Sequence, residues 1–217
     1  MTASHATATT HVDTSPDSGY GTTLRISHRK LLMWAFLASD CMFFGTLIAN
    51  FITYFTRNEG TSPFTFLDIP YTSVSAFVLL MSSLTMVIAL ACIQRGDEIG
   101  MRIWLVATAL LGSVFLGGQY FEFTEFYHKG MQLTGVNLFS SAFFTLTGTH
   151  GLHVTVGVIW LLSLVVVSFT KGIKSSESLN VEIAGLYWHF VDVVWIIIFA
   201  AVYLVGNTMT APPLRGG

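Results

Sequence analysis

Five long apolar stretches constrain the fold of this chain more than any other feature of its sequence. A bilayer core of about 30 Å takes roughly 20 helical residues to cross. Stretches of that length occupy residues 31–55, 71–94, 101–123, 138–169 and 182–205, and the fourth is the longest. A helix satisfies its own backbone hydrogen bonds in lipid. The sequence therefore predicts an all-α, polytopic membrane protein, a bundle of five transmembrane helices.

The composition supports a membrane protein and excludes one class of partner. Only 10% of the 217 residues are charged, whereas soluble domains carry about 25%. The formal net charge is -2, so the chain offers no basic surface of the kind that binds nucleic acid. We therefore expect a membrane and no nucleic acid among its partners.

The lysines and arginines predict how the chain is oriented. Loops that stay cytoplasmic carry an excess of these residues. Five spans place one group of cations on the side of the N-terminus: Arg25, Arg29, Lys30, Arg95, Arg102, Lys171 and Lys174. The opposite side receives Arg57, Lys129 and Arg215. This imbalance predicts a cytoplasmic N-terminus and an external C-terminus.

The ends of the chain are polar. Residues 1–27 are rich in Thr, Ser, Ala and His and lack the apolar centre of a cleavable signal peptide. A segment of this composition buries too little apolar area to fold alone, so we expect a partner subunit on the cytoplasmic face to order it. The predicted division is a tail at 1–27, a transmembrane domain at 28–206 and a short tail at 207–217.

Asp40 lies in the first apolar stretch, within "WAFLASDCMFFGTLIAN". Burial in hydrocarbon disfavours a charged carboxylate, and the nearest cations, Arg29 and Lys30, are about 15 Å away along a helix at ~1.5 Å per residue. We expect an uncharged carboxyl that donates a hydrogen bond to another helix. Two interpretations stay open here: a residue that joins two helices, or a proton or ion site.

Three polar residues, Gln119, Glu122 and Glu125, recur at every third position near the end of the third stretch. Residues at this spacing share one helix face. The stripe is either a solvated helix end or a buried contact between helices.

Two further pairs carry the same spacing: His150 with His153, and His189 with Asp192. Haem is ligated by histidine, but two histidines on one helix face cannot bind both sides of a porphyrin, so a haem would need His189 opposite His150 or His153. Dinuclear metal sites in helical bundles use Glu-x-x-His pairs and further glutamates, which these segments lack. We interpret Gln119, Glu122 and these four residues as polar clasps between helices, with no metal ligand among them.

Three motifs give the chain a resemblance to a known family: "SDCMFFG", "FFTLTGTHGLHVTVGVIW" and "YWHFVDVVWIIIF". Together they resemble subunit III of the haem-copper respiratory oxidases, in its short five-helix bacterial form, over about residues 28–205. The resemblance implies a subunit without catalytic residues, haem or copper, because the redox centres belong to partner subunits. It also implies bound phospholipid, catalytic subunit I and other oxidase subunits as partners, and a multi-pass location in the bacterial cytoplasmic membrane.

The function implied by the resemblance is accessory. Subunit III stabilises the catalytic subunit and supports proton uptake in a complex that reduces oxygen to water and pumps protons. The acid at the position of Asp40 reacts with hydrophobic carbodiimides in the family. Many relatives have glutamate there and two further N-terminal helices, whereas this sequence has aspartate and a polar tail.

Several alternatives remain at this stage. We favour cytochrome c as the electron donor of the complex, but the aspartate resembles the five-helix quinol oxidase form. A haem-binding, quinol-oxidising membrane anchor would use His150 and His189. A stand-alone transporter would use Asp40 and the acids of the third stretch.

Overall fold

The computed structural model is all-helical and contains the five predicted membrane spans. It describes residues 27–56, 69–128, 138–170, 172 and 178–205. The polar N-terminal tail and most of the loops lie outside these residues. The helices are α1 (His28–Thr56), α2 (Ile69–Gln94), α3 (Glu98–His128), α4 (Leu138–Thr170) and α5 (Ser178–Phe199), and a π-helical turn, η3 (Ala200–Val205), follows α5.

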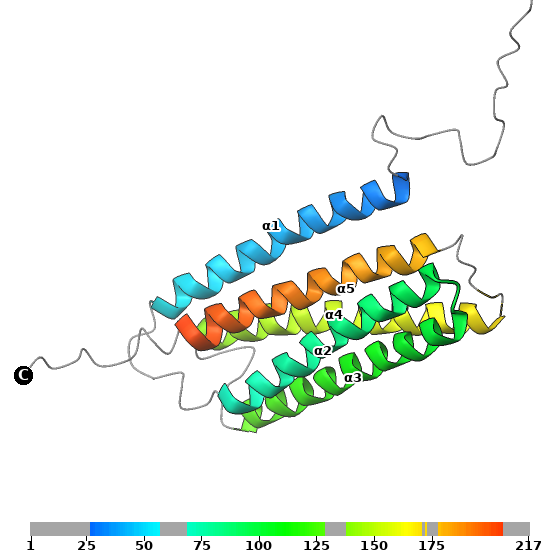
Figure 1. Cartoon of the computed structure of the whole chain (residues 1–217). Helices are drawn as coiled ribbons and strands as arrows, with labels where there is room; N and C mark the ends of the chain where they lie inside the picture. The colour runs from blue at the N-terminus through cyan, green and yellow to red at the C-terminus, as the bar shows by residue number, and fades with distance from the viewer. Residues whose placement is uncertain (1–26, 57–68, 129–137, 171, 173–177, 206–217) are drawn as a thin grey trace, which may run out of the picture.

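Four helices pack in a ring, and Figure 1 shows α1 to one side of the other four. Around the ring α2 packs on α3, α3 on α4, α4 on α5, and α5 on α2. The first helix packs on α4 and α5, so it lies along one edge of the ring. At the start of the chain's first span, Lys30 of α1 forms an ion pair with Glu182 of α5.

The indole of Trp188 packs in the interior of the ring. Trp188 of α5 is 1% exposed, and its indole N–H donates a 3.0 Å hydrogen bond to the hydroxyl of Ser82 on α2. A Cβ atom added to Gly112 of α3 would lie 2.5 Å from Trp188 Cη2. One added to Gly157 of α4 would lie 2.9 Å from Trp188 Cζ3. The two glycines therefore let α3 and α4 close around the indole.

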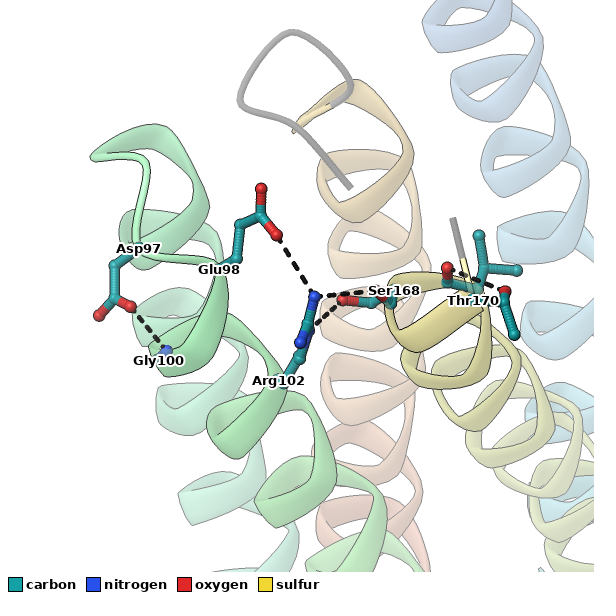
Figure 2. A network of polar contacts seen from close by, with 7 residues as sticks. Asp97, Glu98, Gly100, Arg102, Ser168 and Thr170 are labelled. Atoms are coloured by element: carbon teal, nitrogen blue, oxygen red, sulfur yellow. Dashed lines mark hydrogen bonds and ion pairs between the residues drawn. The ribbon is translucent and has the colours of Figure 1, made fainter. Parts of the chain in front are cut away.

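The α2–α3 connection is a tight turn whose hydrogen bonds end one helix and begin the next. Gly96 adopts a φ of 82°, and the N–H groups of Gly96 and Asp97 donate to the carbonyls of Ile93 and Cys92. This pattern is the Schellman motif, which favours glycine in the left-handed conformation. The carboxylate of Asp97 then caps α3 by accepting a 2.8 Å bond from the N–H of Gly100 (Figure 2).

Arg102 joins α3 to the C-terminal end of α4 (Figure 2). Its Nε donates to the Ser168 hydroxyl at 2.6 Å, and its Nη2 donates to the Ser168 carbonyl at 2.9 Å. The same guanidinium pairs with Glu98 at 3.3 Å and lies over the Phe169 ring. A cation that binds the last carbonyls of a helix also interacts favourably with its dipole.

Candidate functional site

An aspartate of α1, the helix outside the ring, points toward the ring and lies beside a histidine of α4. Asp40 of α1 is 8% exposed, and its Oδ2 lies 3.4 Å from Nε2 of His153. The pair is close enough to interact electrostatically, but its geometry leaves Asp40 Oδ2 without a hydrogen bond. The sequence offered Asp40 no nearby cation, and the fold supplies an imidazole from a position more than a hundred residues later.

The rest of the His153 environment fixes this imidazole in place. Its Nδ1 lies 2.8 Å from the carbonyl of Thr149, one turn earlier on α4. The backbone carbonyl of His153 accepts a 3.0 Å hydrogen bond from the hydroxyl of Tyr187 on α5. The ring of Phe44 from α1 packs edge-on against the imidazole, with centroids 5.0 Å apart. Side chains of α1, α4 and α5 therefore converge at the Asp40–His153 pair.

A groove borders this pair. It has a volume of about 320 Å³ and is lined by Met33, Phe36, Leu152, His153, Val156, Trp160 and Tyr187. Apart from His153 and the Tyr187 hydroxyl, the lining is apolar. The groove gives apolar molecules a place beside an ionisable pair.

His150 differs from the expectation of a polar clasp. The side chain is fully buried, and neither ring nitrogen has a hydrogen-bond partner among the described residues. It stacks on Trp195 of α5 with centroids 4.9 Å apart, and the rings of Phe115 and Phe44 pack around it at 6.0 and 6.4 Å. His150 is therefore an aromatic packing residue in this structure.

His189 and Asp192 were expected to clasp another helix together, and both side chains lie beside Ser83 of α2. His189 Nδ1 lies 2.6 Å from the hydroxyl of Ser83 on α2, which links α5 to α2. Asp192 is 4% exposed, and neither carboxylate oxygen has a hydrogen bond of ordinary geometry within the part of the chain that the structure describes, but the Ser83 hydroxyl interacts with this side chain as well. The clasp at Asp192 stays a prediction, and the hydroxyl of Ser83 on α2 is the donor that faces its carboxyl group.

The three polar residues of α3 do not all share one environment: two are buried between helices and one is exposed. Glu122 is buried and accepts a 2.9 Å bond from the hydroxyl of Thr72 on α2. Gln119 is buried and donates a 2.8 Å bond to the Thr147 carbonyl on α4. Glu125 is exposed. The first two residues thus contact neighbouring helices, and the third lies at the surface.

Two side chains make these contacts possible that the sequence reasoning did not identify. Ser83 is the partner of His189, and Thr72 is the partner of Glu122. Serine and threonine are common in transmembrane helices and usually bond to their own backbone, so no sequence signal distinguishes these two. The helix register decides which hydroxyl faces an ionisable group.

A haem or metal site finds no support in this geometry. No group of three or more His, Cys, Asp or Glu residues is placed to hold a metal ion within the described ranges. A haem between His150 and His189 would have to displace the aromatic rings packed on His150 and the Ser83 contact of His189.

Comparison with known proteins then decides the family. Residues 17–207 match the family model described as cytochrome c oxidase subunit III. The chain belongs to the cytochrome c oxidase subunit III family. Its relatives include the probable quinol oxidase subunit 3 of Staphylococcus saprophyticus, which is 38% identical over 82% of this chain and 89% of the relative.

Relatives of both oxidase types occur in one organism. In Bacillus subtilis the quinol oxidase subunit 3 is 39% identical over 174 residues, 80% of this chain and 85% of the relative. The cytochrome c oxidase subunit 3 of Bacillus subtilis is 37% identical over 196 residues, 89% of this chain and 94% of the relative. The chain is therefore a subunit III of a haem-copper oxidase, of the quinol or cytochrome c type. As such it is a multi-pass bacterial membrane protein that associates with other oxidase subunits.

Proposed function

We propose that this chain is the accessory, non-redox subunit of its oxidase and stabilises the catalytic subunit I, which would carry the haem and copper. The packing of His150 supports this role, because the histidine best placed for a ligand inside the bundle is enclosed by Phe44, Phe115 and Trp195. The complex would reduce oxygen to water and pump protons across the bacterial cytoplasmic membrane.

The Asp40–His153 pair is the part of the site that we propose to support proton uptake. Ionisable residues inside a membrane are costly and are typical of proton relays. The 3.4 Å separation of Asp40 Oδ2 from His153 Nε2 is the observation on which this role rests. A carboxyl and an imidazole at this distance can exchange a proton after a small side-chain movement, because each accepts and donates one.

We further propose that the neighbouring groove holds the acyl chain of a bound phospholipid. Its lining of Met33, Phe36, Leu152, Val156 and Trp160 suits an aliphatic chain. A lipid in this position would keep water away from Asp40 and His153.

For the electron donor we propose cytochrome c, with quinol as the alternative. The match to the Bacillus subtilis cytochrome c oxidase subunit extends over 196 residues, against 174 for the quinol oxidase subunit. Oxygen uptake by the purified complex with reduced cytochrome c or with a quinol as sole donor separates the two.

The accessory role is tested by comparing the intact oxidase with a preparation from which detergent has removed this chain. We expect the depleted complex to keep its haem and its initial rate of oxygen reduction and to lose activity faster during sustained turnover. A depleted complex that has lost its haem, or that sustains turnover as long as the intact one, would contradict the proposal.

A further inference from the structure

One side chain at the middle of the membrane leaves a hydrogen-bonding atom at the protein surface. His189 is the twelfth residue of the span Ser178–Val202. Its Nδ1 is bonded to Ser83, and the structure records no partner for Nε2 among the described residues. Within the described ranges, the enclosed polar atoms without a hydrogen bond belong to Asp40, Gln119, His150, Asp192 and Trp195. Since His189 is half-buried and is not among them, its Nε2 reaches the surface.

The surface around His189 is apolar on both helices. Along α5 the exposed side chains are Val193, Ile196 and Ile197, and along α2 the residues flanking Ser83 include Leu80, Leu84 and Val87. The face of α5 that carries His189 borders α2, because His189 contacts Ser83 there. In the hydrocarbon core, His189 Nε2 would therefore meet acyl chains rather than water.

Lipid cannot satisfy this nitrogen. Acyl chains offer no hydrogen-bonding group, and the ester and head groups lie at the edges of a hydrocarbon core of about 30 Å. His189 lies eleven residues beyond Ser178, which is roughly 16 Å along a helix at ~1.5 Å per residue. An unsatisfied polar group at this depth is costly.

Several hydroxyl groups at the membrane-facing surface are satisfied within their own helices. The hydroxyls of Thr46, Thr53 and Ser163 donate to carbonyls of their own helices at 2.9, 2.8 and 2.6 Å. These residues need nothing from outside the chain. His189 thus differs from them in requiring an external partner.

We propose that the α2–α5 face around His189 is the surface on which a transmembrane helix of another oxidase subunit docks. That helix presents a hydrogen-bonding side chain or a free backbone carbonyl to His189 Nε2 and covers Val193, Ile196 and Ile197. The inference rests on the membership of this chain in a multi-subunit oxidase, and it adds which face makes the contact.

Photo-crosslinking in the intact oxidase tests the position of this surface. Benzoylphenylalanine is placed at Val193, one turn beyond His189, and in a matched variant at Val166, which is 61% exposed on α4. We expect the Val193 variant to form a covalent adduct with another oxidase subunit, identified by mass spectrometry, and the Val166 variant to form none. Adducts from Val166 alone, or only lipid adducts from Val193 in a complex that still contains the subunit, would overturn the docking face. Failure of the wild-type chain to co-purify with any oxidase subunit would overturn the accessory role as well.

The role of the nitrogen itself is tested by substitution. We expect His189→Phe to speed the loss of this chain from the detergent-washed complex by about threefold, the effect of one average hydrogen bond between membrane helices. His189→Gln keeps a hydrogen-bonding group and should restore retention. Ser83→Ala removes the contacts of Ser83 with His189 and Asp192 inside the chain and leaves His189 Nε2 in place. An equal loss in that variant would show that His189 acts within the chain, contrary to the proposal.

Discussion

The indole of Trp188 leaves no room for a side chain at the glycines packed against it. A methyl group at position 157 would lie 2.9 Å from its ring carbon Cζ3, and overpacking of a core costs typically 1–3 kcal/mol. We expect Gly157→Ala to lower the thermal stability of the solubilised subunit by this amount. Gly117→Ala is the matched control, because a Cβ atom there meets nothing within 4 Å. Equal stability of the two variants in a thermal unfolding assay would contradict the packing.

Asp40 is the buried carboxyl group of α1 beside the apolar groove. A hydrophobic carbodiimide should label Asp40 selectively, because the apolar groove beside His153 admits the reagent. Asp40→Asn keeps the side-chain volume and should leave the initial rate of oxygen reduction near that of the wild type. Peptide mapping by mass spectrometry locates the label. Labelling confined to Glu122 or Glu125, or an Asp40→Asn oxidase with full haem content and no oxygen reduction, would refute the assignment.

The sequence identified which polar residues matter more readily than it identified their partners. Ionisable side chains are rare in transmembrane helices, so the sequence draws attention to Asp40, His150, His189 and Asp192. Their contacts depend on how the helices are rotated about their axes, which apolar side chains determine collectively. The same spacing of three therefore gave His189 a hydrogen bond to Ser83 and left His150 among aromatic rings.

The α2–α3 hairpin contains a helix cap that a single substitution can remove. Asp97 accepts the bond from the Gly100 N–H at the first turn of α3, and loss of such a cap costs about 0.5–2 kcal/mol. We expect Asp97→Ala to destabilise the subunit by this amount and Asp97→Asn, which retains an acceptor oxygen, to behave like the wild type. Chemical denaturation in detergent measures both. A wild-type midpoint for Asp97→Ala would show that the cap is dispensable.

Thr72 of α2 and Glu122 of α3 join the two helices at the ends away from the hairpin turn. Thr72→Val deletes the hydroxyl that donates to Glu122, and such bonds between membrane helices average ~0.6 kcal/mol and reach at most ~2. The expected result is a small loss of thermal stability. Thr46→Val removes a hydroxyl that donates a 2.9 Å bond to the Met42 carbonyl of its own helix, so it controls for the substitution. A loss as large in Thr46→Val would remove the case for an inter-helix contribution.

The extents of the helices were predictable where hydropathy and helix length coincide. The fourth stretch was expected at 138–169 and α4 covers Leu138–Thr170. The third was expected at 101–123, whereas α3 covers Glu98–His128. The difference arises because Glu98 and the residues around Glu125 lower the hydropathy without interrupting the helix. A capped helix can extend beyond the hydrocarbon core into the polar interface.

For the whole molecule, the number of spans and the family follow from the sequence, and the ring with α1 outside it does not. Apolar length determines whether a helix crosses the membrane, but the packing order depends on small residues such as Gly112 and Gly157 and the side chain that they admit. The orientation with a cytoplasmic N-terminus stays a prediction of the positive-inside rule.

The central claim is that this chain is an accessory subunit and carries no redox centre of its own. The most direct measurement is affinity purification through a tag on this chain from mildly solubilised membranes, followed by haem spectroscopy and mass spectrometry of the intact complex and of the chain after its release. We predict co-purification with a larger haem-bearing subunit, and a released chain without a Soret band. A released chain with a stoichiometric Soret band, or a chain that purifies without any oxidase subunit, would contradict the account.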